Sequence, residues 1–358
     1  MATVLSTRLT EMLGCEYPII QTAMGWVATS DLVIASINGG AFGFLAAAVM
    51  NPDECEKEII RIKEASDRPF GVNIHSFQPG AEKIVDMCID HGVRAVSYGR
   101  SPSGKLIDKL KGANIYCVPT IGAGKHAQKA VDLGADVLVC QGQEGGGHTG
   151  QTPTWLLLSQ VRESVDVPVV PAGGFKDGRG LAAALAFGAD GIAMGTRFLL
   201  TSSSPTPMAT KNEYLKSDVT KIPVSTKLDG LRQRMVLNDT LARLERSSRP
   251  EMFIRALLNG WKFKEVTGAS MAEMVKTALD TARKTDLTFS QTLMAANAPM
   301  IIQKSMVEGK PEEGVLPSGQ VAGLIDDLPS CEALVASIVA EAQTQLSKFQ
   351  THNKKAAE

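Results

Sequence analysis

The residues best suited to chemistry lie in three glycine-rich turns, and each turn directly follows an apolar run. The first turn reads QGQEGGGHTG over residues 141–150 and contains His148, the second reads PAGGF over 171–175, and the third reads MGT over 194–196. A strand that ends in glycine presents backbone N–H groups to the space beyond it, which suits an anion. An imidazole titrates near neutrality, and the glycines beside His148 leave room for a substrate. The pattern predicts a phosphate on the last two turns and an acid or base at His148.

The predicted phosphate site consists of backbone amides, with one hydroxyl as a further donor: Gly173, Gly174, Gly195 and Thr196. The alternative interpretation is structural, because tight turns between strands and helices also use glycine without any ligand. Three other titratable residues are expected near His148. For His75 and His126 we favour a structural role, and for Lys125 we favour a solvated side chain without a ligand.

Side-chain amides and one methionine complete the candidate ligand contacts. Asn73 and Gln141 stand where apolar runs end and can read the donors and acceptors of a flat heterocycle, although each could instead cap a loop. The segment Ala23-Met24-Gly25 would let a ring approach the backbone, with Met24 as a soft apolar contact. Core packing is an equal alternative for Met24. No metal site is predicted, because the histidines are not at ligand spacing and no carboxylate cluster accompanies them.

Eight apolar runs position these residues. They begin about every two dozen residues and cover 17–22, 42–46, 69–74, 93–97, 115–120, 136–141, 167–172 and 191–195. The segments between them carry apolar residues at helical spacing and often end on glycine. This alternation predicts an α/β fold, a closed (β/α)8 barrel of the TIM type. A doubly wound open sheet is the alternative, but the first unit lacks the dinucleotide fingerprint that such a sheet usually carries.

A barrel of this kind would bring all the candidate residues to one place. The residues that directly follow parallel strands share one face of the barrel, its mouth. Three of the five histidines, His75, His126 and His148, fall on this side, and Tyr98 and Gly122 are expected there as well. The barrel prediction therefore carries the prediction of the site.

Residues 1–205 are predicted to form the barrel, and within them 3–14 form a short amphipathic helix that closes its bottom. The polar stretch TSSSPTP at 201–207 breaks the pattern before an eighth helix begins. Residues 206–313 are predicted to form an α-helical insertion after the eighth strand, which would serve as a substrate domain.

Two segments of this insertion, 238–247 and 271–284, have charged amphipathic patterns that predict helices. The chain is expected to return to the barrel over 314–350 and to end in a long helix from 330 to about 348. Residues 351–358 are predicted to be a flexible tail.

The composition argues against several classes of partner. The 358 residues include 37 basic and 38 acidic side chains, so neither a nucleic acid nor a membrane partner is indicated. Six cysteines without a C-x-x-C pair predict reduced thiols rather than disulfides or zinc. No apolar run reaches the roughly 18 residues of a membrane span. We expect a soluble, cytoplasmic protein with a small-molecule substrate, and we consider a homodimer as its assembly.

These motifs resemble those of the nitronate monooxygenase family, formerly called 2-nitropropane dioxygenases, which also includes the FMN-dependent enoyl-acyl-carrier-protein reductases. The resemblance runs from about residue 5 to about residue 340. It rests on five segments in order: QTAMGW (21–26), FGVNI (70–74), CQGQEGGGHTG (140–150), the long segment 168–201 and PSGQVAGLI (317–325).

The resemblance implies that the cofactor is non-covalent FMN. It implies that the phosphate lies on the four residues of the second and third turns, and that His148 is the catalytic base or acid. It also implies that the return segment Gly319-Gln320 reaches the site, with Gln320 closing over the flavin ring. The ring itself would lie against Ala23, Met24, Asn73 and Gln141.

Within the family, the segments 290–301 and 314–331 resemble a branch that acts on CoA thioesters in bacterial steroid catabolism, on the C/D-ring indane intermediate. This resemblance implies hydride exchange between the flavin and the β-carbon of the substrate, while an acid or base handles the α-proton. NADH or NADPH is the candidate co-substrate. Arg232 and Arg234 in the insertion are candidates for contacts to the CoA phosphates.

Three functions compete at this point. The first is an FMN-dependent oxidoreductase that reduces or oxidises the α,β carbon–carbon bond of a CoA thioester. The second is a nitronate monooxygenase that oxidises alkyl nitronates with O2. The third is a non-catalytic barrel that binds a phosphate-bearing ligand, because a fold does not dictate a function.

Overall fold

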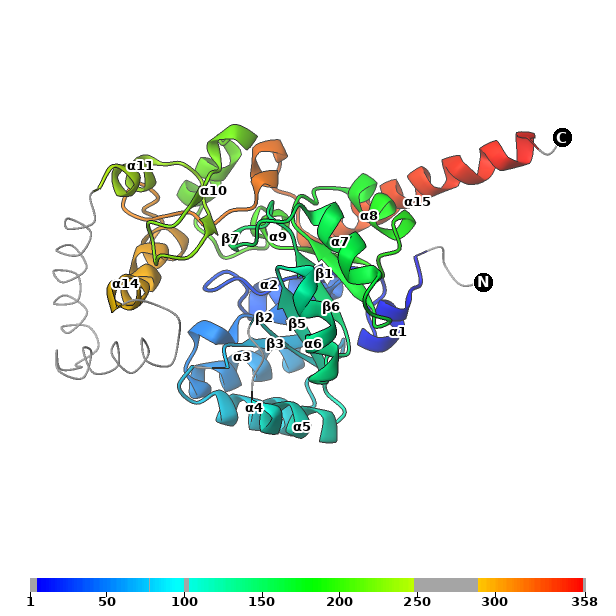
Figure 1. The fold of residues 1–358 in the computed structure, drawn as a ribbon, viewed down its shortest axis with the longest axis horizontal. Helices are drawn as coiled ribbons and strands as arrows, with labels where there is room; N and C mark the ends of the chain where they lie inside the picture. The colour runs from blue at the N-terminus through cyan, green and yellow to red at the C-terminus, as the bar shows by residue number, and fades with distance from the viewer. Residues whose placement is uncertain (1–4, 77, 100–102, 248–288, 357–358) are drawn as a thin grey trace.

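Eight parallel strands close into a barrel, in a computed structural model that describes residues 5–76, 78–99, 103–247 and 289–356 (Figure 1). The strand order is β1-β2-β3-β4-β5-β6-β8-β9, and β9 pairs with β1 to close the ring. Each strand coincides with one of the predicted apolar runs, and none extends more than one residue beyond its run, so the (β/α)8 prediction is confirmed. The strands are β1 (Ile19–Gln21), β2 (Phe42–Leu45), β3 (Gly71–Ile74), β4 (Ala95–Tyr98), β5 (Tyr116–Ile121), β6 (Leu138–Gln141), β8 (Val169–Ala172) and β9 (Ile192–Met194).

Amphipathic helices surround the barrel, and their apolar sides pack on the outward-facing residues of the strands. Local signals fix their ends: Asn51, for example, accepts the Glu54 N–H at 2.9 Å and completes a capping box at the start of α3. The helices of the repeating units are α2 (Ser30–Asn38), α3 (Pro52–Ala65), α4 (Ala81–Asp90), α5 (Gly104–Gly112), α6 (Ala127–Asp132), α7 (Thr154–Arg162) and α8 (Gly178–Ala186).

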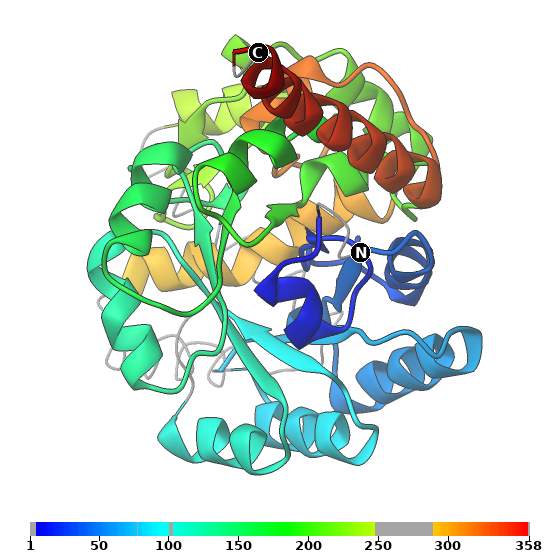
Figure 2. The same cartoon turned by 90° about the vertical axis from the view of Figure 1, so that its right-hand side faces the viewer.

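Helix α1 (Arg8–Leu13) closes the amino-terminal end of the barrel, as predicted. Its Leu9 and Leu13 belong to the same buried cluster as Ile20 and Phe44, which fill the barrel interior. Figure 2 shows α1 in front of the near end of the barrel. Because this end is plugged, the opposite end remains as the mouth.

The insertion was predicted to be helical, and this prediction is wrong in part. It contains α10 (Met208–Leu215), α11 (Asp239–Arg246) and α14 (Phe289–Met306), but also the strands β10 (Val224–Ser225) and β11 (Gln233–Arg234). These two strands form an antiparallel sheet with β7 (Gly147–His148), which belongs to the first glycine-rich turn. Strands of two residues are too short to show a period of two in the sequence, so the pattern of the flanking helices dominated the prediction.

The predicted helix at 238–247 is confirmed as α11, and Asn238 accepts the Leu241 N–H at 2.9 Å to begin it. The predicted helix at 271–284 lies outside the described residues. In Figure 1, α11 and α14 lie on the far side of the barrel from α1. The described part of the insertion therefore stands on the side of the mouth.

The chain returns to the barrel through a 3₁₀ helix, η4 (Gln320–Leu324), and ends in α15 (Cys331–Ala356). Helix α15 packs against α8 and α2, and Figure 1 shows that it extends beyond the barrel. It continues to Ala356, and the flexibility of the tail from residue 351 stays a prediction. The domain boundaries remain a prediction.

All six cysteines are free thiols, as the absence of paired spacing predicted, and five of them are buried. Among the described residues, no helix is long and apolar enough to cross a membrane.

Candidate active site

The second and third glycine turns lie side by side at the mouth. Strands β8 and β9 are hydrogen-bonded neighbours with Ala172 opposite Ala193, so the turns that follow them share one edge. The return segment reaches the same place, because the Gly319 N–H donates to Thr196 Oγ1 at 2.8 Å. Closure of the barrel therefore brings together three segments that are far apart in the sequence.

Gly173 and Gly174 form a left-handed backbone turn directly after β8. Their φ angles are +111° and +84°, a left-handed conformation that side chains disfavour. A Cβ atom on Gly174 would meet only Glu144 Cβ, at 3.9 Å, so the space in front of this glycine is open. Successive amides in such a turn can point at one anion.

The β1 turn lies directly against the β9 turn. A Cβ atom on Gly195 would lie 3.0 Å from Thr22 Oγ1 and 3.3 Å from Met24 Sδ. Ala23, Met24 and Gly25 are half-buried, so part of the surface of each residue stays accessible at the mouth. Met24 is thus next to the predicted phosphate turn.

The two candidate side-chain amides are each partly engaged by the protein. Asn73 Nδ2 donates to the Ser97 carbonyl at 3.1 Å and to its hydroxyl at 3.0 Å. Gln141 Nε2 donates to the carbonyls of His148, at 2.8 Å, and Gly146, at 3.2 Å. Gln141 therefore holds the first glycine turn in place, and its side-chain oxygen is the atom that it can offer to a ligand N–H.

His148 stands in β7 and pairs with a carboxylate that the sequence did not suggest. Its Nε2 lies 2.7 Å from Asp229 Oδ2. The Asp229 side chain is 6% exposed, whereas that of His148 is 61% exposed. The imidazole is thus anchored on its inner edge and open on its outer edge, which suits an acid or base that meets a substrate.

Asp229 is surrounded by donors. Its Oδ1 accepts the Leu231 N–H at 2.9 Å, and its Oδ2 accepts a hydrogen bond from Gln233 Nε2 at 2.5 Å. Burial raises the pKa of Asp229, but the hydrogen bond and the charge of His148, with the donors Leu231 and Gln233, lower it more, so the net pKa lies below the ordinary value. The carboxylate is therefore ionised at neutral pH.

Sequence reasoning missed Asp229 because it lies 81 residues after His148. The only local signal was the Asp-Gly pair at 229–230, which is typical of a turn between two strands. A turn signal says nothing about which side chain the aspartate will meet.

The return segment closes on the first glycine turn. The Gln320 N–H donates to the Glu144 carbonyl at 2.9 Å, and a Cβ atom on Gly146 would lie only 2.6 Å from Gly319 N. The Gln320 side chain donates to the Val219 carbonyl at 3.1 Å. Gly319 and Gln320 are thus at the mouth as predicted, while the side-chain nitrogen of Gln320 is directed to the insertion.

Several predicted residues do not join this centre. Tyr98 is buried between the barrel and its helices, at 2% exposure, so its placement at the mouth was wrong. Arg234 is also buried, and it donates to the carbonyls of Gln143 and Ile222 at 2.9 and 2.6 Å, so its assignment to CoA phosphates was wrong. Exposed side chains remain at Arg232, His75, Lys125 and His126.

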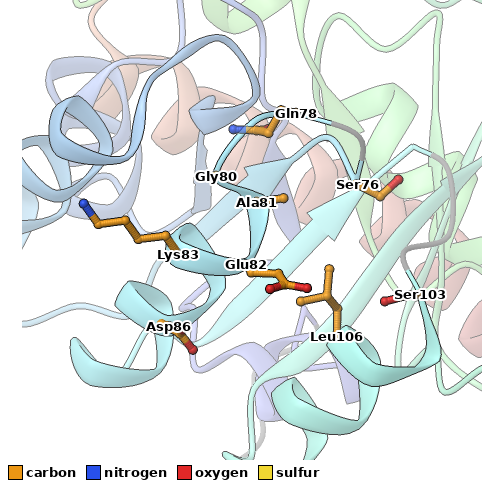
Figure 3. A pocket seen from close by; sticks show the side chains of 9 residues that line it. All are labelled: Ser76, Gln78, Gly80, Ala81, Glu82, Lys83, Asp86, Ser103 and Leu106. Carbon is orange, nitrogen blue, oxygen red and sulfur yellow. The ribbon is translucent and has the colours of Figure 1, made fainter. Parts of the chain in front are cut away.

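A cavity of 660 Å³ lies apart from these residues, between the first turns of α4 and α5 (Figure 3). Ser76, Glu82, Lys83 and Asp86 are among the residues that line it. Lys83 already pairs with Asp53 at 3.0 Å, and Asp86 pairs with Lys109. In the part of the chain that the structure describes, no group of three or more His, Cys, Asp or Glu side chains could hold a metal ion.

The chain forms a closed (β/α)8 barrel, and its mouth carries a glycine turn whose amides could bind an anion and a histidine–carboxylate pair. These features are typical of a barrel enzyme with its active site at the carboxyl ends of the strands. The chain belongs to the nitronate monooxygenase family, whose sequence profile matches residues 6–86 and 75–341. Membership makes the protein an oxidoreductase and implies a flavin cofactor, so the hypothesis of a non-catalytic barrel is not retained.

The chain is similar to proteins with two different names. Proteins of Rhodococcus jostii and Mycobacterium tuberculosis are both 47% identical, over 94% and 96% of this chain and 96% and 97% of their own. Both are named (3aS,4S,5R,7aS)-5-hydroxy-7a-methyl-1-oxo-octahydro-1H-indene-4-carboxyl-CoA dehydrogenase. A probable nitronate monooxygenase of Staphylococcus saprophyticus is 31% identical, over 67% of this chain and 81% of its own.

Two solved structures superpose on most of this chain. FabK from Thermotoga maritima superposes with a TM-score of 0.80 at 29% identity, covering 98% of this chain and 100% of FabK. Nitroalkane oxidase from Streptomyces ansochromogenes gives 0.76 at 25% identity, covering 95% and 99%.

Proposed function

We propose that this protein is an FMN-dependent dehydrogenase that acts on the α,β carbon–carbon bond of a CoA thioester, with a reduced indene carboxylic acid from the C/D rings of a steroid as the acyl group. The observation that carries the proposal is the 47% identity to two indene-carboxyl-CoA dehydrogenases over at least 94% of the chain. The nitronate monooxygenase relative shares less identity over a shorter part of the chain, so that function is the weaker candidate.

The described residues fit FMN at the mouth. The backbone amides of Gly173 and Gly174 would hold the phosphate, together with Gly195 and Thr196. Met24, Asn73 and Gln141 would contact the ring, with Ala23, Gly25, Gly319 and Gln320 around it. When bound, the flavin would supply the hydride chemistry, for which no amino-acid side chain is suited.

His148 would move the proton. The carbon next to a thioester carbonyl must lose or gain a proton when the α,β bond is oxidised or reduced, and an imidazole can do this near neutral pH. Its exposed outer edge gives a substrate access, and its inner edge is fixed by Asp229.

Three further expectations belong to the same proposal. NADH or NADPH is the proposed redox co-substrate, a homodimer the proposed assembly, and the cytoplasm the proposed location. The six free thiols support a reducing compartment.

Anaerobic mixing of the yellow holoprotein with the indene-carboxyl-CoA named above tests the function. We expect the flavin absorbance to fall as the substrate is oxidised, and we expect the free acid without CoA to leave it unchanged. A flavin that responds to no CoA thioester would refute the proposal. Rapid O2 consumption with propionate 3-nitronate in its place would identify the protein as a nitronate monooxygenase.

A further inference from the structure

The insertion contributes a side chain to the catalytic centre of the barrel. Asp229 lies between β10 and β11, and β11 pairs with β7 so that Gln233 stands opposite His148. The side chains of these two residues therefore share a face of the small sheet, and Asp229 lies within hydrogen-bond distance of both.

We propose that Asp229 is a positioning residue that holds the His148 imidazole with its hydrogen on Nε2 and leaves Nδ1 as the atom that exchanges a proton with the substrate. This inference rests on the acid/base role of His148 in the proposed function. It adds which ring nitrogen acts, and it assigns the residue that selects that nitrogen.

The tautomer follows from the hydrogen-bond inventory. An ionised carboxylate can only accept, so a contact of 2.7 Å between Asp229 Oδ2 and His148 Nε2 requires a hydrogen on that nitrogen. Gln233 Nε2 also donates to Asp229 Oδ2. The 3.2 Å separation between Gln233 Nε2 and His148 Nε2 is then a contact between two donors that converge on one oxygen.

The Asp229 carboxylate is held in place by donors other than His148. The Leu231 N–H holds Oδ1 at 2.9 Å, and Gln233 holds Oδ2, so the acceptor does not depend on His148 for its orientation. The Asp229 side chain is 6% exposed, so little water competes for it. A catalytic base whose orientation is fixed by another, buried side chain is a recurrent arrangement in enzymes.

The first test reads the tautomer directly. In protein labelled with 15N at histidine, long-range NMR correlations distinguish a protonated Nε2 from a protonated Nδ1, and a His148→Gln sample identifies the His148 signals. We expect a neutral His148 in the parent protein to carry its hydrogen on Nε2, and Asp229→Asn to shift it towards Nδ1. A hydrogen on Nδ1 in the parent overturns the proposal, even if the variant does not fold.

The matched control is Asp218→Asn. Asp218 Oδ1 accepts the Thr220 N–H at 2.8 Å, two residues on, just as Asp229 Oδ1 accepts from Leu231. Asp218 is exposed, however, and the hydrogen-bond partner of its carboxylate among the described residues is Thr220 rather than a histidine. We expect this variant to keep the parent tautomer and the parent rate. Loss of the tautomer in both variants would show a general effect of the insertion and would overturn the specific role of Asp229.

The second test is kinetic. Asp229→Asn should lower kcat by about 10²-fold with little change in KM, because general acid–base catalysis is worth about that much. Adding Asp229→Asn to a His148→Ala protein should cause no further loss, since the two residues act as a unit. Equal rates for Asp229→Asn and the parent would overturn the proposal.

These results separate this inference from the proposed function. The tautomer is measured without turnover, so a protein that ignores indene-carboxyl-CoA but shows the expected shift in Asp229→Asn would lose the function and keep the positioning role. A protein that turns over the thioester with an unchanged tautomer in Asp229→Asn would keep the function and lose the positioning role.

Discussion

His148 is the exposed member of a pair whose other member is buried, and this asymmetry fits a proton carrier. Asp229 fixes one ring nitrogen, so the imidazole has a defined orientation while its outer edge meets the solvent. His75 and His126 are exposed on the same side of the barrel, and His148 is the histidine there that pairs with the buried carboxylate of Asp229.

His148→Ala should keep its flavin and lose about 10²- to 10⁴-fold in kcat, because the proposed flavin contacts do not include the imidazole while proton transfer depends on it. Steady-state rates with the CoA thioester, together with the flavin content of the purified variant, measure both effects. His126→Ala is the control, since His126 is exposed at the start of α6, and it should behave as the parent. A His148→Ala protein as fast as the parent would assign the acid/base role to another group.

Gly174→Asp should lose FMN, because it places a side chain and a negative charge in the open space where the phosphate is proposed to lie. Gly188→Asp is the matched control: its φ of +89° is close to the +84° of Gly174, and it also has open space in front of it, but it follows α8 away from the mouth. Both variants carry the same backbone cost of about 1–2 kcal/mol. Full flavin occupancy in Gly174→Asp would refute the proposed phosphate position.

At the scale of elements, the first glycine turn is the joint between the barrel and the insertion. Its residues 147–148 form a strand of the small sheet, and its Gly146 lies against the backbone of Ser318 and Gly319. Gln141 at the end of β6 donates to two carbonyls of the turn. The glycines here therefore serve close packing of main chains, as well as leaving room for a substrate.

Gly146→Ala should destabilise the protein by about 1–3 kcal/mol, because its Cβ would lie 2.6 Å from two backbone atoms that cannot rotate away. Chemical denaturation of the holoprotein measures the change. Gly104→Ala, in which the new Cβ meets nothing within 4 Å at the start of α5, should change the stability by less than about 1 kcal/mol. Equal stabilities of the two variants would show that the turn can move away from the return segment.

At the scale of the whole molecule, burial of thiols makes the stability depend on alkaline pH. Burial is the main cause that raises the pKa of Cys117 to about 11 and those of Cys15, Cys55 and Cys140 to about 12. An unfolded thiol ionises near pH 8.5. Because the folded pKa is raised, the contribution of each thiol is fully present below about pH 8.5 and is lost as the pH rises towards 11 or 12.

The free energy of unfolding should therefore fall between about pH 8.5 and about pH 10, by up to roughly 2 kcal/mol for each deeply buried thiol. Cys55→Ala removes one thiol from the buried face of α3. In this variant the fall in the free energy of unfolding should be smaller by the contribution of that one thiol. Urea denaturation of both proteins at the two pH values measures the difference. A parallel loss in the two proteins would mean that this thiol ionises in the folded state as readily as in the unfolded state.

Much of the fold could be read from the sequence because its signals are local. Each strand of the barrel coincides with an apolar run, and the plug α1 and the helix α11 follow from apolar spacing and capping residues. Glycine turns after β8 and β9 could be placed at one mouth, since parallel strands in a barrel end on one side. The short strands β10 and β11 were not predicted, because they arise from pairing with each other and with β7 rather than from a local sequence pattern.

The sequence by itself determined the barrel, the glycine turns at its mouth and the presence of His148 there. Only the tertiary structure decided that Asp229 meets His148, that Arg234 is buried, and that Tyr98 faces the helices rather than the mouth. Periodicity and turn residues reflect interactions between residues that are close in the chain, so they can be recognised in the sequence. A contact across 81 residues depends on how the insertion folds back onto the barrel, and no local pattern encodes which side chain it will bring to the histidine.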